Sequence, residues 1–212
     1  MKLRAMLVVF GSSTLLASSI TVFSDFGPGR SYGGSPYNVT GSSSVMSYEA
    51  VAVPFTPSAS VGLTQVDAAF EMLDPFLGGD GSITLSLLAD NGGQPGANLV
   101  TWENLTIPSS SSVLTVNCSS CASLVSGTQY WLAVVPVNGN TGVGWDSNNQ
   151  NVQGRVGFLM PQWFASWQVQ SGWTLPAFDV LGESNSVPEP ATGWLWPTMI
   201  TGLYLRRRRR AA

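Results

Sequence analysis

The chain contains no histidine, and charged residues make up only 10% of its 212 positions. The missing histidine excludes a Ser-His-Asp or Cys-His relay, a histidine general base and a histidine metal ligand. Soluble domains usually carry about 25% charged residues, so groups for ionic chemistry are scarce here. Hydrolysis by paired carboxylates stays formally open, but no spacing among the acidic residues singles out a pair. We therefore expect no catalytic activity.

The few charges are placed unevenly along the chain. All twelve acidic residues lie between Asp25 and Glu189, where the only cations are Arg30 and Arg155. The other basic residues are at the two ends: Lys2, Arg4 and Arg206–Arg210. An acidic body repels phosphate and favours a cation, which argues against nucleic acid as a partner. The basic ends therefore need a separate explanation.

Residues 1–19 have the order that is typical of a secretory signal peptide. Lys2 and Arg4 form a basic start, residues 6–16 are apolar, and the small residues Ala17 and Ser19 follow. This order predicts an N-terminal signal helix that is cleaved just after Ser19 during export.

Residues 191–205 form a short apolar run at the other end of the chain. As a helix this run would be about 22 Å long, whereas a hydrocarbon core is roughly 30 Å thick, and Pro197 interrupts it. An arginine cluster follows directly: Arg206, Arg207, Arg208, Arg209 and Arg210. Arginines hold a segment's end on the cytoplasmic side and extend its reach, so we expect a short membrane helix here.

Val187, Pro188, Glu189 and Pro190 precede this apolar run and its arginine cluster. This three-part ending, together with the N-terminal signal, resembles the PEP-CTERM sorting signal of Gram-negative bacteria. The resemblance implies processing by an exosortase, a membrane transpeptidase-like enzyme, after transient anchoring in the inner membrane. It also implies that the export machinery is a partner and that the cell surface or extracellular matrix is the destination.

The body of the chain alternates between apolar and polar residues with a period of two and shows no convincing helical pattern. Ile83, Leu85 and Leu87, for example, face away from Ser82 and Thr84. Such alternation predicts half-buried antiparallel strands. The predicted strands are 63–72, 82–87, 97–103, 113–118, 129–137, 152–159 and 173–181, with 130–135 as a central strand covered on both faces.

Gly- and Asn-rich turns separate these segments, so residues 45–182 are predicted to form an antiparallel β-sandwich of jelly-roll type. Residues 20–44 are rich in Gly and Ser and are predicted to be a flexible or irregular lead-in, and residues 183–212 carry the sorting signal. The segments LSLLADNGGQPGANLVTW, SGTQYWLAVVP and SWQVQSGWTLPAFDVLG are similar to β-sandwich domains of the choice-of-anchor kind. That resemblance implies a bacterial surface protein and carries over no site.

Cys118 and Cys121 form a C-x-x-C pair in a Ser-rich turn after a predicted strand. Neither a helix start for redox chemistry nor the further Cys or His ligands for zinc are present. The pair is therefore predicted to form a structural disulfide in an oxidising compartment.

Asp80, Asp90 and Asp146 lie in predicted loops and are the candidates for calcium binding. Loop carboxylates and amides are the oxygen ligands that calcium takes. The competing interpretation is that Asp-Asn-Gly is simply a turn sequence. No other cofactor is indicated.

Tryptophan is abundant, and six of the eight tryptophans lie in the body. Trp163 and Trp167 have polar neighbours and are predicted to be exposed, where aromatic faces can stack on sugar rings. Trp131 and Trp173 lie in apolar segments and are predicted to be buried.

Together these features predict an exported, non-catalytic protein of the cell surface or extracellular matrix. The alternative is a carbohydrate-binding module for extracellular polysaccharide, with calcium as its candidate cofactor. Exposed and coplanar rings of Trp163 and Trp167 would favour this alternative, whereas a hydrolase would need two carboxylates facing each other in a cleft.

Overall fold

Two antiparallel sheets account for the part of the chain that the computed structural model describes, residues 19–43, 47–73, 80–119 and 121–184. These residues form thirteen strands, which confirms the all-β prediction. The predicted signal helix, the sorting motif and the arginine cluster lie outside the described residues. Within the described ranges no helix is long and apolar enough to cross a membrane.

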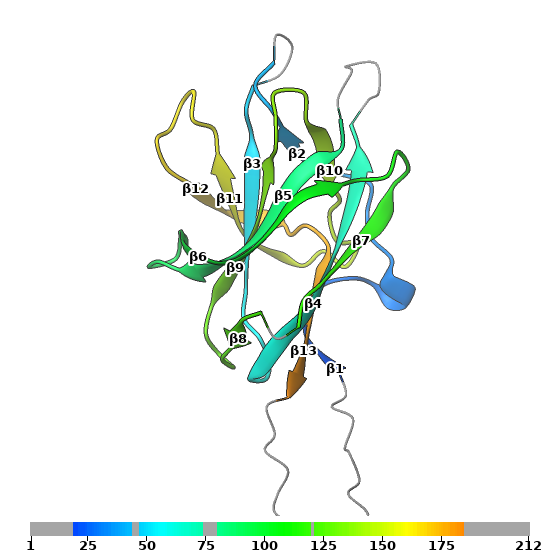
Figure 1. The fold of residues 1–212 in the computed structure, drawn as a ribbon, viewed down its shortest axis with the longest axis vertical. Helices are drawn as coiled ribbons and strands as arrows, with labels where there is room; N and C mark the ends of the chain where they lie inside the picture. Colours follow the sequence, from blue (N-terminus) through cyan, green and yellow to red (C-terminus); the bar gives the residue numbers. More distant parts are fainter. Residues whose placement is uncertain (1–18, 44–46, 74–79, 120, 185–212) are drawn as a thin grey trace, which may run out of the picture.

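Seven strands form one sheet, with the order β1-β13-β4-β10-β2 and with β7 and β8 also paired to β4. Their bounds are β1 Ser19–Ser24, β2 Tyr37–Thr40, β4 Val61–Met72, β7 Ser112–Asn117, β8 Ser123–Leu124, β10 Gly142–Trp145 and β13 Phe178–Ser184. The first and last strands of the described chain are neighbours, with Ile20 opposite Gly182. Figure 1 shows β1 and β13 side by side at one end of the molecule.

The other sheet has six strands in the order β12-β11-β3-β9-β5-β6. Their bounds are β3 Ala50–Phe55, β5 Ser82–Asp90, β6 Pro95–Thr106, β9 Tyr130–Pro136, β11 Gln153–Leu159 and β12 Gln168–Thr174. On β9, Leu132 points into the main core, whereas Trp131 packs with Ala52 and Leu88 on the outer face of the sheet. This arrangement confirms the prediction of a central strand that is covered on both faces.

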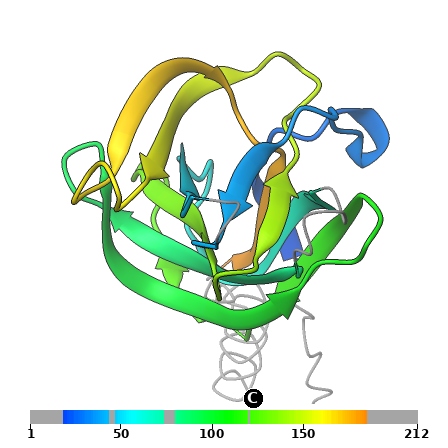
Figure 2. The same cartoon turned by 90° about the horizontal axis from the view of Figure 1, so that it is seen from above.

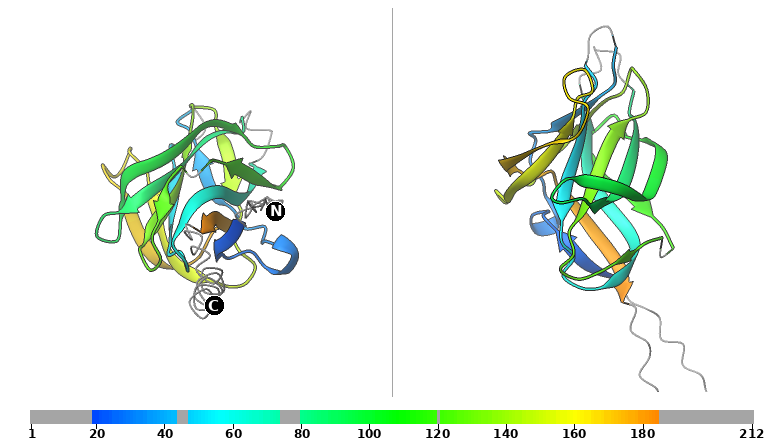
Figure 3. Two further views of the ribbon diagram at one scale, coloured as in Figure 1. Left: turned by 60° about the horizontal axis from the view of Figure 1, so that its bottom comes forward. Right: turned by 90° about the vertical axis from the view of Figure 1, so that its left-hand side faces the viewer.

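The two sheets pack face to face around one apolar core (Figures 2 and 3). Trp145, Phe70 and Phe178 of the seven-stranded sheet are fully buried, as are Leu85 and Leu132 of the six-stranded sheet. Each such side chain contributes about 1.5–3 kcal/mol when it is removed from water. The alternation of apolar residues along each strand therefore fixes which face of each sheet points inward.

β2, and β1 apart from its first residue Ser19, lie in the segment 20–44 that was predicted to be a lead-in. That prediction is wrong for these strands because Val22 and Val39 insert into the core. A strand at the edge of a sheet needs few apolar residues, since only one of its faces is covered and one neighbour supplies its hydrogen bonds.

The predicted single strand 173–181 is also wrong, because the chain changes sheets within it. β12 ends at Thr174 and β13 begins at Phe178 in the other sheet. Pro176 lies at the crossing, and it has no N–H to continue a ladder. The backbone N–H of Leu175 instead donates to the carbonyl oxygen of Val152, and that of Ala177 donates to the carbonyl oxygen of Asp146.

Asp25 follows β1 and is almost completely buried, with 3% of its surface exposed. Its Oδ1 accepts a hydrogen bond from the Phe178 N–H (2.7 Å), whereas its Oδ2 is buried without a partner. Burial raises the pKa of Asp25 to about 8; the bond from Phe178 lowers it, and the charge of Asp179 raises it further. The folded protein therefore holds Asp25 as a neutral acid near neutral pH.

Because this pKa is higher in the folded than in the unfolded chain, stability should fall as pH rises from about 4 to about 8. The loss is on the order of several kcal/mol. The variant Asp25→Asn mimics the neutral acid, so its free energy of unfolding should fall much less between pH 5 and pH 9 than that of the wild type. Urea denaturation at these two pH values would measure the difference. Asp80→Asn is the control, because the hydrogen bond from Asn138 and that from the Ser82 N–H lower the pKa of Asp80. An equal fall in wild type and Asp25→Asn would contradict the prediction.

Candidate functional site

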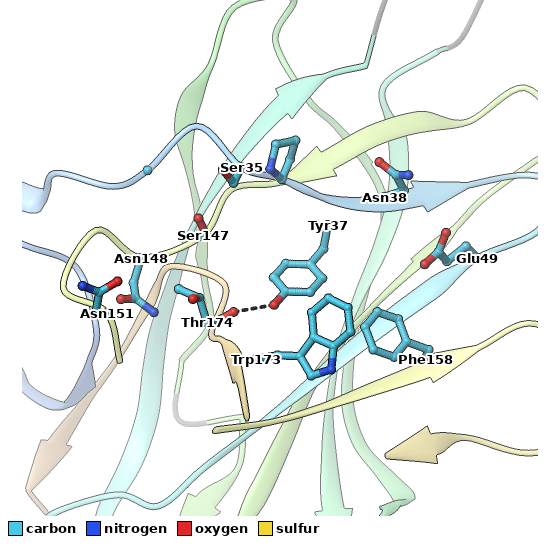
Figure 4. A pocket seen from close by; sticks show the side chains of 12 residues that line it. Ser35, Tyr37, Asn38, Glu49, Ser147, Asn148, Asn151, Phe158, Trp173 and Thr174 are labelled. Atoms are coloured by element: carbon cyan, nitrogen blue, oxygen red, sulfur yellow. Dashed lines mark hydrogen bonds between the residues drawn. The ribbon is translucent and has the colours of Figure 1, made fainter. Parts of the chain in front are cut away.

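A cleft of about 620 Å³ opens between the edges of the two sheets. One wall is β2, the last strand of the seven-stranded sheet, and the other is β11 and β12 at the edge of the six-stranded sheet. We call this hollow the edge cleft. Its lining residues are Gly33, Ser35, Pro36, Tyr37, Asn38, Glu49, Ser147, Asn148, Asn151, Phe158, Trp173 and Thr174 (Figure 4).

Three aromatic rings meet in the edge cleft: Tyr37, Phe158 and Trp173. The centroids of Phe158 and Trp173 are 5.6 Å apart in an edge-to-face arrangement, and each lies 6.1 Å from Tyr37. Trp173 is 44% exposed, so part of its indole is open to a ligand. The prediction that Trp173 is buried is therefore wrong.

A β-bulge at Gly172 determines where Trp173 points. Trp173 pairs with Gly154 and Ser171 pairs with Arg155, so Gly172 is an extra residue between the two pairs. Gly172 has φ +83°, a backbone conformation that favours glycine. An extra residue shifts the alternation by one. Trp173 therefore lies on the same side of the sheet as the core residue Phe158, and not on the outer face.

The edge cleft is bridged at its aromatic cluster by a hydrogen bond between the two sheets. The Tyr37 hydroxyl on β2 donates to the Thr174 carbonyl oxygen at the end of β12 (2.5 Å). Burial raises the pKa of Tyr37 to about 12, which keeps this donor protonated. The bond therefore fixes one sheet edge against the other and holds the Tyr37 ring beside Trp173.

Asn148 shapes one end of the edge cleft. Its Nδ2 donates to the carbonyl oxygens of Val152 (2.9 Å) and Leu175 (2.7 Å), and its Oδ1 accepts from the N–H groups of Gln150 and Val152. Because both the amide donor and the amide acceptor of its side chain are used within the fold, Asn148 has a structural role.

Three other polar side chains of the edge cleft are available. No described residue forms a hydrogen bond with the side chain of Asn38, Glu49 or Asn151, and Asn38 and Asn151 are exposed. Burial raises the pKa of Glu49 above its usual value. The edge cleft therefore combines aromatic rings with unused amide groups and one carboxylate.

The predicted tryptophan pair does not form a shared stacking surface. Trp163 is 65% exposed on the loop between β11 and β12. Trp167 is instead half-buried, and it packs on the outer face of the six-stranded sheet with Trp131 and Ala133. Sugar binding through this pair required both rings to be exposed, and Trp167 does not meet that requirement.

The three aspartates predicted as calcium candidates lie far apart. Asp80 precedes β5 and Asp90 is its last residue, and the nine residues of this strand span about 30 Å. Asp146 follows β10, whose first residue, Gly142, bonds to the Asp80 carbonyl. Among the described residues, no three His, Cys, Asp or Glu side chains gather in a way that could hold a metal ion.

Asp90 is the centre of a polar network on the outer face of the six-stranded sheet. It accepts hydrogen bonds from Trp131 Nε1 (2.8 Å), from the Gly93 N–H (3.0 Å) and from Gln129, which in turn accepts from Arg155. Burial raises the pKa of Asp90, but these three hydrogen bonds and the Arg155 charge lower it overall. Its carboxylate oxygens are thus already used to hold the β5–β6 turn.

Cys118 and Cys121 are joined by a disulfide directly after β7. The bond closes a loop of four residues beside β4 and lies away from the residues that line the edge cleft.

No protein-family model matches the chain, and a comparison with curated proteins finds no significant similarity. The candidate site therefore stands on its geometry alone. Sequence reasoning missed the edge cleft because it placed Trp173 in the core. The signal that could have revealed it is Gly172, since a glycine inside a strand pattern often marks a bulge.

Asp90→Ala should lower the free energy of unfolding by roughly 2 kcal/mol, because it leaves the buried indole N–H of Trp131 unpaired. Adding calcium should not change this difference, which denaturant titration with and without calcium would measure. The matched variant Asp80→Ala removes the hydrogen bonds from the Ser82 N–H and from Asn138 Nδ2 but leaves no buried indole N–H unpaired, so it should cost less. A calcium-dependent rise in stability that Asp90→Ala abolishes would mean that Asp90 is a metal ligand after all.

Proposed function

We propose that this protein is an exported, non-catalytic β-sandwich of jelly-roll type that binds polysaccharide in its edge cleft at the cell surface or in the extracellular matrix. The observation that carries the proposal is the partly exposed Trp173, which lies in a cleft with unused amide groups. This proposal joins the two functions expected from the sequence, with the edge cleft replacing the pair Trp163 and Trp167.

A sugar ring matches this combination of groups. Its C–H face is apolar and stacks on an aromatic ring, while its hydroxyl groups donate and accept hydrogen bonds around the rim. In the edge cleft Trp173 offers the ring, and Asn38 and Asn151 offer amide donors and acceptors. The volume of about 620 Å³ lies in the range of small-molecule sites, roughly 300–1,000 Å³.

The arrangement of the termini supports delivery by a sorting signal. β1 and β13 are antiparallel neighbours, so the chain enters and leaves the sandwich at one end (Figure 1). Cleavage after Ser19 would keep Ile20–Ser24 of β1, and β13 ends at Ser184, before Val187. Both proposed processing points can therefore be cut without removing a whole strand. The exosortase would cut, and the inner membrane would anchor, only segments that lie outside the sheets.

We expect Trp173→Ala to weaken binding to a soluble polysaccharide at least about tenfold, the equivalent of about 1.4 kcal/mol. Affinity electrophoresis through gels that contain a β-glucan, a galactan or a chitosan would measure the change. Trp163→Ala is the control, since Trp163 is more exposed but lies on the β11–β12 loop outside the lining of the edge cleft. Equal retardation of wild type and Trp173→Ala in every gel, or loss only in Trp163→Ala, would refute the proposed site.

Intact mass spectrometry of the protein from its native host tests the proposed sorting. The surface and medium fractions should contain a form that starts near Ile20 and ends near Val187–Pro190. Full-length protein in the cytoplasm would contradict export. The arginine cluster would then belong to the working molecule.

A further inference from the structure

Among the described residues, Glu49 is the only charged one that lines the edge cleft. It lies just before β3 and bridges to Thr40 at the end of β2, so its backbone position is fixed by two hydrogen bonds, one in each direction. The carboxylate is placed beside Asn38 and the aromatic cluster in Figure 4. Neither of the two arginines in the described residues, Arg30 and Arg155, lines the edge cleft.

The carboxylate of Glu49 is partly withdrawn from water without compensation from the part of the chain that the structure describes. Glu49 is half-buried, and no described residue donates a hydrogen bond to its side chain or forms an ion pair with it. Removing a charge from water is costly unless a partner replaces the lost hydration. A ligand that brings a positive charge to Glu49 would recover this cost, whereas a ligand with its own carboxylates would add repulsion.

The aromatic cluster beside Glu49 favours the same kind of ligand. Tyr37, Phe158 and Trp173 pack against one another with centroids 5.6–6.1 Å apart, and the 44% exposed Trp173 offers an open ring surface to the cleft. The face of an aromatic ring attracts a cation that lies within about 6 Å of its centroid. An ammonium group in the edge cleft could therefore meet both a carboxylate and aromatic faces.

We propose that the edge cleft recognises a glycan with free amino groups, an amino sugar whose amine is not acetylated. This inference rests on the proposed function and names its ligand class. One ring of the sugar stacks on Trp173, and its ammonium group pairs with Glu49. Uronic-acid polymers are disfavoured, because none of the described residues that line the cleft is a cation to receive their carboxylates and because the surrounding body is acidic.

Isothermal titration calorimetry with four tetramers tests this specificity: β-1,4-linked glucosamine, its fully N-acetylated form, galacturonic acid and tetralysine. Wild type should bind the glucosamine tetramer about tenfold more tightly than the N-acetylated one, as a charge-assisted hydrogen bond allows. Glu49→Gln should lose this preference and bind both at the level of the N-acetylated tetramer. Glu103→Gln, which removes the same charge from exposed β6 at the far edge of the sheet, should retain the preference.

Each other outcome has a definite meaning. Equal binding of the two glucosamine tetramers by wild type, with loss of both in Trp173→Ala, would overturn the amine preference and leave polysaccharide binding intact. If Glu49→Gln still preferred the glucosamine tetramer over the N-acetylated one, Glu49 would not be the group that recognises the amine. Tight binding of tetralysine would mean that the cleft binds amines in general, and it would overturn the proposal that the ligand is a glycan. Absence of binding to every tetramer and polysaccharide would overturn the proposed function itself. Thermal unfolding of Glu49→Gln without ligand checks that this variant is folded.

Discussion

The single apolar core between the two sheets is the constraint on which the rest of the structure depends. It brings the inner faces together, but it does not join the sheets along their edges, because β2 and β12 form no ladder with each other. Where these edges diverge, side chains from both sheets line an opening, and Tyr37 bridges it through its contacts with Trp173 and Thr174. The edge cleft is thus a direct result of packing two separate sheets, and its walls are as rigid as the strands that carry them.

Two local features turn this opening into a defined site. The bulge at Gly172 rotates Trp173 inward, and the hydrogen bond from Tyr37 to Thr174 sets the distance between the edges. Neither feature contributes much to the burial of the core. Their value is positional, because they place rings from different strands within 6.1 Å of one another. A bulge near a sheet edge is a common means of redirecting one side chain.

The sequence predicted the strands that alternate cleanly and missed those that do not. Ile83, Leu85 and Leu87 mark β5 unambiguously, whereas β10 has the sequence Gly-Val-Gly-Trp and β2 has Val39 as its only core residue. Such short strands are formed by tertiary packing and leave little periodic signal. The candidate site was missed for a related reason. Whether Trp173 is buried depends on the register of β12 against β11, and a one-residue shift exchanges the two faces of a strand.

The two kinds of buried carboxylate in this protein have different physical consequences. Asp25 accepts a hydrogen bond from the Phe178 N–H, and burial raises its pKa to about 8, so it carries no charge near neutral pH. The neighbouring carboxylates Asp67 and Asp179 form salt bridges with Arg30. Glu49 has no such neighbour among the described residues, although it is also withdrawn from water. A fold gains nothing from an isolated half-buried charge, since a neutral side chain of similar size would be more stable there. An uncompensated carboxylate in the wall of an open aromatic cleft is therefore better explained by a positively charged ligand than by the stability of the sandwich.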